Sequence, residues 1–254
     1  MNFTDSTLFK NKPSFGHVIF DADDTLLCYR DDERGAFLRL FSTLGVAADD
    51  ALLSFSCNAS ERIWAETGLY DVSSPRVQKH YHALYRDHIT HVFDEIFAYL
   101  HSRKIAFTPV SSACARDLFL TELETGGHYV EGARETLAVL KSRGYVLSVA
   151  TNGLETVQRG RTKGLLPFFD HLFVSESLGA IKPAEEFFIR MLRKLNARKE
   201  ECLFVGDSLS SDIAGAKTAG ICCCYFSPCG EKPPAAVPVP DFTVRRLTEL
   251  LAVL

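Results

Sequence analysis

The stretch His17-Val18-Ile19-Phe20-Asp21-Ala22-Asp23-Asp24-Thr25 decides the fold of this chain. Its first four residues are a short apolar run with β-branched and aromatic side chains, which is typical of a strand buried in a parallel sheet. Asp21 and Asp23 follow directly. Ligands of open α/β sheets bind beyond the carboxyl ends of the strands. We therefore expect these carboxylates to face one substrate and one metal ion together, an arrangement that suits phosphoryl transfer.

Three further segments repeat this pattern of an apolar strand followed by polar residues. Each is a weak signal alone, because such residues also occur in ordinary turns and helix caps. Their occurrence in this order favours one shared site. The segments are 145–150 before Thr151-Asn152-Gly153, 171–176 before Lys182-Pro183, and 202–205 before Gly206-Asp207-Ser208 with Asp212.

Composition narrows the class of protein. The chain has 254 residues and is 46% hydrophobic, which is enough for one large domain or for a core with a substantial insertion. The formal net charge of −4 gives no general attraction to a nucleic acid polymer or an anionic membrane. A phosphate site must therefore create its own positive field from a metal ion, a lysine and backbone amides.

Targeting signals and cysteine motifs are missing from the sequence. Residues 1–16 hold no apolar run long enough for a signal peptide, and no stretch has the length of a membrane span. We expect a cytoplasmic protein with no membrane partner. The eight cysteines form no CxxC pair, so we interpret them as small core residues rather than disulfide or metal ligands.

The chain changes character twice along its length. Between Thr25 and Tyr145 the apolar residues recur at helical spacing over 37–44, 51–64, 77–100 and 112–123. From Glu131 onward helical and strand patterns alternate, which implies a parallel sheet. We expect an α/β core domain at 1–28 and 128–254 and an inserted helical domain at 29–127. Within the core we expect a strand at 221–226, a loop at 232–240 and a closing helix at 244–254.

Asp21 is the predicted nucleophile. A carboxylate is ionised at neutral pH, and its attack on phosphorus gives an aspartyl-phosphate intermediate. An anion that attacks an anionic phosphate needs charge neutralisation, and Mg²⁺ with oxygen ligands fits that need. We expect the metal ligands to be Asp21, Asp207 and the backbone carbonyl of Asp23.

The remaining polar residues are assigned to proton transfer and phosphate binding. The Asp23 side chain would protonate the leaving alkoxide and later take a proton from water, with Thr25 orienting it. Lys182 would supply positive charge to the phosphoryl group, and Asp212 would hold Lys182 or a metal-bound water. The predicted phosphate donors are the Thr151 hydroxyl and the amides of Asn152 and Gly153, at an expected helix N-terminus.

The helical insertion carries weaker signals. His80, His82, His88 and His91 recur along one expected helix, and we interpret them as a polar face rather than a metal site. Trp64 and Tyr70 suit either the core of the insertion or a pocket for a base, and the first interpretation is favoured.

The four motifs Asp21-x-Asp23-x-Thr25, Thr151, Lys182-Pro183 and Gly206-Asp207 with Asp212 resemble those of the haloacid dehalogenase superfamily of phosphohydrolases. The resemblance covers about 15–25 and 131–254. It implies a Rossmann-like three-layer parallel sheet core with an inserted α-helical cap domain after the first motif. It also implies the same roles for Asp21, Asp23, Thr151, Lys182 and Asp207.

Within that superfamily, Phe20-Asp21-Ala22-Asp23, Ala150-Thr151-Asn152-Gly153 and Val174-Ser175-Glu176 resemble bacterial pyrimidine 5'-nucleotidases. We therefore predict a Mg²⁺-dependent phosphomonoester hydrolase that acts on a small-molecule ester, with nucleoside 5'-monophosphates as the leading substrates. A sugar-phosphate or phosphoglycolate-type phosphatase, a phosphomutase, and a silenced module that only binds Mg²⁺ or phosphate remain alternatives. The oligomeric state is not predicted.

Overall fold

The chain, in a computed structural model, is described over residues 15–230 and 238–254. Within these residues six strands form one sheet in the order β3-β2-β1-β4-β5-β6, with all neighbouring strands parallel. The predicted α/β core is therefore confirmed. The strands are β1 (His17–Phe20), β2 (Val146–Thr151), β3 (His171–Val174), β4 (Cys202–Gly206), β5 (Cys222–Phe226) and β6 (Phe242–Val244).

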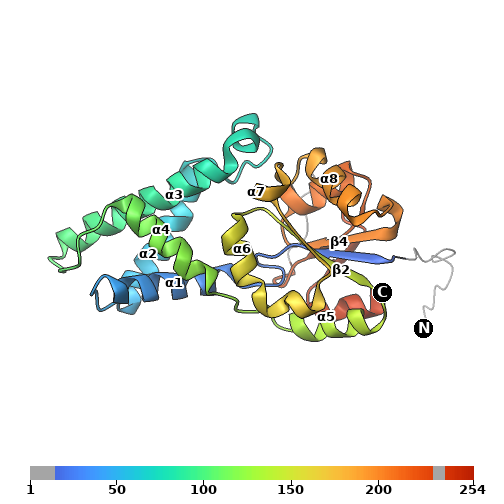
Figure 1. Cartoon of the computed structure of the whole chain (residues 1–254), viewed down its shortest axis with the longest axis horizontal. Coiled ribbons are helices and arrows are strands. Elements are labelled where there is room, and N and C mark those ends of the chain that lie inside the picture. Colours follow the sequence, from blue (N-terminus) through green and yellow to red (C-terminus); the bar gives the residue numbers. More distant parts are fainter. Residues whose placement is uncertain (1–14, 231–237) are drawn as a thin grey trace, which may run out of the picture.

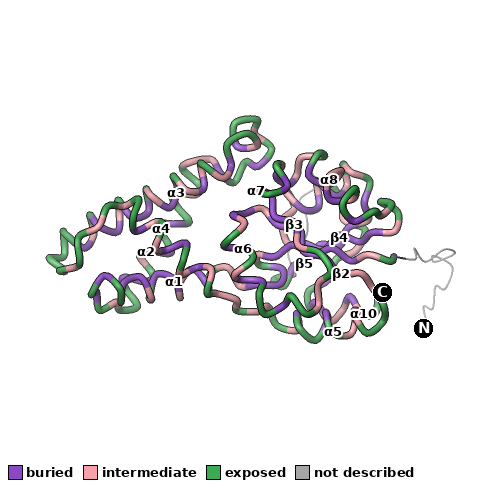
Figure 2. Tube along the Cα trace, in the orientation of Figure 1, coloured by how far each residue is buried: buried purple, intermediate pink, exposed green. Residues whose placement is uncertain are grey.

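Helices cover both faces of this sheet. Successive side chains of a strand point to opposite faces, so Val18 and Phe20 of β1 pack with α5 and α10, whereas Ile19 packs with α8 and α9. The sheet is the buried middle of three layers (Figure 2). The core helices are α5 (Ala133–Ser142), α6 (Glu155–Arg161), α7 (Ser175–Leu178), α8 (Glu185–Leu195), α9 (Ala214–Thr218) and α10 (Leu250–Val253).

The inserted residues form a helical bundle at one end of the molecule, and α6 lies between this bundle and the sheet (Figure 1). Phe37, Phe93 and Phe119 meet at its centre with ring centroids 4.6 to 6.0 Å apart. Although α3 has 28 residues, no helix of the described chain is both long and apolar enough to cross a membrane. The bundle helices are α1 (Tyr29–Thr43), α2 (Asp50–Glu66), α3 (Pro75–Ser102) and α4 (Ser112–Glu124).

The chain crosses between the sheet and the bundle at two adjacent points. Leu27 on the outgoing crossing forms an antiparallel bridge with Tyr129 on the return crossing. The Cys28 N–H donates to the His128 carbonyl oxygen over 2.8 Å. We propose that these crossings divide the core, 1–28 and 128–254, from the cap, 29–127.

A second contact joins cap and core through α3 and α7. His82 Nε2 lies 2.8 Å from Ser175 Oγ. Arg86 Nη2 donates to Glu176 Oε1 over 2.9 Å. The cap therefore contacts the core at the crossings and through α7, and α4 of the cap also packs against α6 of the core.

Two expectations about the core need correction. The segment 171–176 is not all strand, because Ser175 begins α7. The expected closing helix at 244–254 is only α10, since Val244 pairs with Phe226 at the end of a sixth strand. That strand has three residues, too few to show an alternating pattern. The expected loop at 232–240 lies outside the described residues up to 237.

The cysteines follow the expectation in part. Cys57, Cys202, Cys223 and Cys224 are buried, whereas Cys114 and Cys229 are exposed. None of the cysteines in the described residues is paired in a disulfide.

Gly160 provides a test of how tightly the core packs against the cap. A Cβ at this position would lie 2.4 Å from the backbone oxygen of Glu124, the last residue of α4. We expect Gly160→Ala to lower the free energy of unfolding by about 1–3 kcal/mol, because overpacking outweighs the gain in helix propensity.

The matched control is Gly16→Ala, where a Cβ meets nothing within 4 Å. Its free energy of unfolding should stay within about 0.5 kcal/mol of the wild type. Urea denaturation measures both variants, and equal stabilities would contradict the packing of α6 against α4.

Candidate active site

Three strand ends place the predicted residues together. Asp21 follows β1, Thr151 ends β2, and Asp207 follows β4. Since β1 lies between β2 and β4, these ends meet where the strand order reverses direction. Such a switch point is where open α/β sheets bind their ligands.

Lys182 is the central cation of this site, and only 1% of its surface is exposed. Its Nζ donates to Asp21 Oδ1 over 2.5 Å, to Asp212 Oδ1 over 2.6 Å and to the Ala150 carbonyl oxygen over 2.9 Å. Burial alone would lower the pKa of Lys182, but Asp21 and Asp212 raise it above its usual value. Lys182 is therefore a permanent positive charge, and the expected pairing with Asp212 is present.

Asn152 positions Lys182 through the backbone. The side-chain amide of Asn152 donates to the Lys182 carbonyl oxygen over 2.9 Å, and its oxygen accepts the Lys182 N–H over 2.8 Å. This double hydrogen bond fixes the loop after β3 against the end of β2. Asn152 was predicted to contribute its backbone amide to phosphate, whereas its side chain has this further role.

Three carboxylates form a cluster around Lys182. Ligand oxygens of Asp21, Asp207 and Asp212 lie within 4.8 Å of one another. Burial raises the pKa of Asp21 in spite of Lys182, and burial together with Asp212 raises the pKa of Asp207 to about 7. Three acids against one ammonium leave excess negative charge, and their oxygens suit a hard divalent cation such as Mg²⁺. Asp212 thus joins the candidate ligand set, beyond its expected supporting role.

Thr25 differs from its prediction. It is fully buried, and its Oγ1 donates to Asp207 Oδ1 over 2.9 Å. It therefore orients Asp207 and not Asp23. The reason is geometric, because the turn after β1 carries Thr25 under the end of the neighbouring strand β4.

Asp23 is held instead by two residues of α6. Gln158 Nε2 donates to Asp23 Oδ2 over 2.8 Å, and the guanidinium of Arg161 forms an ion pair with Asp23 Oδ1. Neither residue was predicted from the sequence. In the sequence, the only indication of Gln158 and Arg161 is their spacing of three positions, which places two polar side chains on one face of a helix.

The segment after β2 also differs from its predicted role in phosphate binding. Thr151 is buried and lines the pocket as predicted. The Gly153 N–H, however, donates to Ser175 Oγ over 3.0 Å. The helix begins only at Glu155, whose N–H donates to Glu176 Oε2 over 2.8 Å. The donors expected at Gly153 and at the helix start are thus already bonded to residues of α7.

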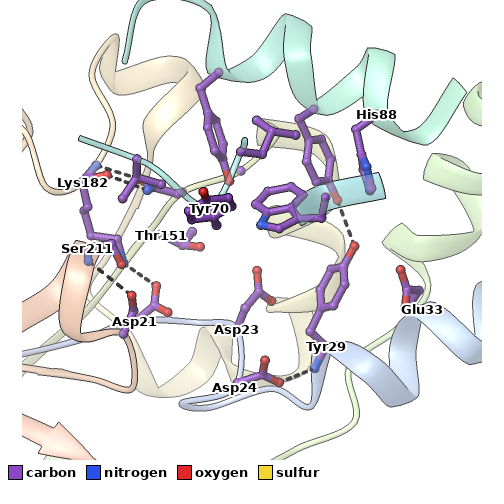
Figure 3. Close-up of a pocket in the computed structure, with 18 of the residues that line it drawn as sticks. Asp21, Asp23, Asp24, Tyr29, Glu33, Tyr70, His88, Thr151, Lys182 and Ser211 are labelled. Carbon is purple, nitrogen blue, oxygen red and sulfur yellow. Dashed lines mark hydrogen bonds and ion pairs between the residues drawn. The ribbon is translucent and has the colours of Figure 1, made fainter. Parts of the chain in front are cut away.

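A pocket of about 560 Å³ opens above these residues, between core and cap. Figure 3 shows Asp21 and Lys182 at one end, Glu33 and His88 at the other, and Tyr29 and Tyr70 between them. Tyr70 is 64% exposed, so the favoured assignment of this residue to the insertion core is wrong. The aromatic side chains of the pocket are Tyr29, Trp64, Tyr70, Tyr81 and Tyr85.

The cap end of the pocket carries a polar cluster. Ser60 Oγ donates to Glu33 Oε1 over 2.7 Å and lies 3.4 Å from His88 Nε2. His88 is only 3% exposed and stands edge-on to Trp64. The predicted polar helix face is therefore wrong for His88, because that side of α3 packs against α2 instead of facing solvent.

Comparisons with known proteins agree with this geometry. Residues 15–220 match the family model described as haloacid dehalogenase-like hydrolase. The pyrimidine 5'-nucleotidase PynA of Streptococcus pneumoniae is 28% identical over 83% of each chain. A glyceraldehyde 3-phosphate phosphatase of Pyrococcus furiosus is 37% identical, over 38% of this chain and 41% of its own.

A solved structure extends the likeness to the whole fold. The putative HAD-hydrolase YfnB of Bacillus subtilis is 28% identical over 93% of this chain and 94% of its own. Its crystal structure, described as bound to magnesium, superposes with a TM-score of 0.77 over 94% of this chain and 98% of that chain. The family model spans most of the sequence, and the predicted motifs converge on one pocket. The chain therefore belongs to the haloacid dehalogenase-like hydrolase family and is an enzyme of the phosphatase type.

Proposed function

We propose that this enzyme is a Mg²⁺-dependent phosphomonoesterase that acts through an aspartyl-phosphate. The observation that carries the proposal is the separation of two pocket carboxylates into different networks. Asp21 is bonded to Lys182, whereas Asp23 is bonded to Gln158 and Arg161. Two acids with different partners at one substrate suit two roles, a nucleophile and an acid–base group.

The reaction divides into two transfers. An oxygen of Asp21 bonds to phosphorus while the ester P–O bond breaks, and the departing alkoxide takes a proton from Asp23. Asp23 then takes a proton from water, whose oxygen attacks phosphorus and releases phosphate from Asp21. Lys182 and the Thr151 hydroxyl stabilise the charge of the transferring group.

Asp21, Asp207 and Asp212, with the backbone carbonyl of Asp23, are the residues that would hold Mg²⁺. Bound there, Mg²⁺ neutralises charge on the phosphoryl group and on the nucleophile. Thr25 supports this role, because its hydrogen bond fixes one oxygen of Asp207.

Nucleoside 5'-monophosphates, and pyrimidine nucleotides above all, are the substrates we propose. The aromatic side chains that line the pocket favour a substrate with a flat ring, because ring stacking adds to the burial of apolar area. PynA aligns over 83% of this chain, so the likeness extends into the cap. The alignment with the glyceraldehyde 3-phosphate phosphatase covers only 38%.

The charges along the pocket support the same leaving group. Burial raises the pKa of Glu33 to about 7 and lowers the pKa of His88 to about 4. Near and below neutral pH Glu33 and His88 are therefore uncharged but polar, with Arg30 and Glu61 also in the pocket lining, whereas the core end holds the buried acids and Lys182. An ester with an anionic phosphate at one end and a neutral polar base at the other matches this division.

The first test measures phosphate release from nucleoside monophosphates, sugar phosphates and phosphoglycolate, with Mg²⁺ and with a chelator. We expect pyrimidine nucleotides to be preferred and the chelator to abolish activity. Asp21→Asn should lower kcat by about 10³-fold or more, because the attacking carboxylate is lost. Asp117→Asn, an exposed acid of α4, is the charge-matched control.

Other outcomes of this assay separate the alternatives. Preference for a sugar phosphate or phosphoglycolate would overturn the nucleotide assignment and keep the chemistry. Transfer of phosphate between positions of one substrate, without release, would indicate a mutase. Folded protein that binds Mg²⁺ but hydrolyses no ester would indicate a silenced binding module.

A substitution at Glu33 tests, through the pH dependence of stability, whether this carboxyl is uncharged in the folded chain. The pKa of this carboxyl is about 7 in the folded chain and about 4.3 in an unfolded one. The folded state thus binds more protons between these values, and stability falls as pH rises through about 7. The side chain that the Glu33→Gln substitution introduces cannot ionise. The free energy of unfolding of this variant should therefore rise relative to that of the wild type between pH 5 and pH 8.

The gain should reach up to about 3 kcal/mol, and urea denaturation at both pH values measures it. Glu200→Gln, an exposed acid, should keep a constant difference from the wild type over this range. A Glu33→Gln difference that does not change with pH would contradict the burial of an ionisable carboxyl at the cap end.

A further inference from the structure

Arg161, the last residue of α6, is a buried cation outside the Lys182 network. None of its side chain is exposed, and its guanidinium pairs with two carboxylates. One is Asp23, and the other is Asp32, which accepts from Arg161 Nε over 2.8 Å. Gln158, one turn earlier on α6, donates to the second oxygen of Asp23. Helix α6 therefore holds both oxygens of the proposed acid–base group.

Asp32 connects Arg161 to the two crossings between core and cap. It lies in the first turn of α1, just after the outgoing crossing, and it is fully buried. Its Oδ1 accepts the N–H of Gly127 over 2.8 Å and the N–H of His128 over 3.0 Å, both on the return crossing. The return crossing lies so close that a Cβ on Gly126 would be 2.6 Å from Asp32 Cγ.

Arg161 also contacts Tyr29, a residue that lines the pocket. Its Cζ lies 5.2 Å from the ring centroid of Tyr29, the first residue of α1. The Tyr29 hydroxyl is 3.2 Å from the hydroxyl of Tyr85 on α3. One guanidinium thus touches the acid–base carboxylate, the outgoing crossing and, through Asp32, the return crossing.

We propose that Arg161 is a positioning residue that holds the Asp23 carboxylate in place and couples its position to the core–cap crossings. A buried ion pair by itself is weak evidence for a stabilising role. Here, however, the pair joins a pocket carboxylate to the two crossings between core and cap. The role of Asp23 in proton transfer rests on the proposed function, whereas the coupling to the crossings does not.

Position matters because a general acid must lie within hydrogen-bond reach of the oxygen that it protonates. A misplacement of about 1 Å can lower a rate by about 10²-fold. Loss of Arg161 should therefore slow esters whose leaving group needs a proton, and slow much less those whose leaving group departs as a stable anion.

The first experiment compares kcat/KM for an alkyl phosphate and for p-nitrophenyl phosphate, because kcat/KM reports the transfer to Asp21. We expect Arg161→Met to lower the alkyl value by about 10²-fold and the p-nitrophenyl value by less than about 10-fold. Arg161→Lys, which keeps the charge, should recover part of the loss. Arg159→Met is the control, since Arg159 lies on the same helix with an exposed side chain paired to Glu155.

The second experiment measures hydrogen exchange at the amides of Gly127 and His128 and needs no turnover. We expect Asp23→Ala and Arg161→Met to speed exchange there several-fold, although Asp23 is 104 and 105 positions away in sequence from these amides and is not bonded to them. Arg159→Met should exchange like the wild type.

The two experiments separate this inference from the proposed function. If the wild type hydrolyses neither ester with Mg²⁺, the proposed function fails, and the exchange data still decide the coupling. If Arg161→Met slows both esters equally and Asp23→Ala leaves the exchange unchanged, Arg161 has only a structural role and the inference is overturned.

Discussion

The hydrogen bonds of the Lys182 ammonium to Asp21 and Asp212 are the interaction on which the site depends. A buried ammonium is costly unless its partners are charged and well placed, and Asp21 and Asp212 would repel each other without it. The three side chains come from the segments that follow β1, β3 and β4. Assembly of the site therefore requires all three segments to be in place. Asn152 reinforces it by binding the backbone of the lysine itself.

The structure shows two organising cations, of which the sequence patterns predicted only Lys182. Lys182 is bonded to Asp21, the proposed nucleophile, and to Asp212, both of which belong to the core. Arg161 acts on Asp23 and, through Asp32, on the crossings to the cap. Although Asp21 and Asp23 are two residues apart, they are bonded to different parts of the molecule. Environment, and not residue type, is what gives two carboxylates two roles.

Sequence patterns predicted the residues whose positions follow from a strand. Asp21, Thr151, Lys182 and Asp207 could be placed because parallel strands bring their carboxyl ends to one edge. Gln158 and Arg161 could not, since Asp23 precedes them by 135 and 138 positions. His88 was misassigned because helical spacing shows that a face exists and not what packs against it. Thr25 was misassigned because a tight turn can direct a hydroxyl toward either neighbouring strand.

The division of the pocket between core and cap has a mechanical consequence. The residues of the charged end, Asp21, Lys182, Asp207 and Asp212, are bonded to one another or to other core residues. Asp23 alone among the proposed catalytic groups shares a cation with a cap residue. In the proposed mechanism, proton transfer is then the step whose geometry depends on the cap, whereas attack on phosphorus depends on core residues. That arrangement links protonation of the leaving group to the element that contacts the leaving group, because the cap also carries Trp64, Glu33 and His88.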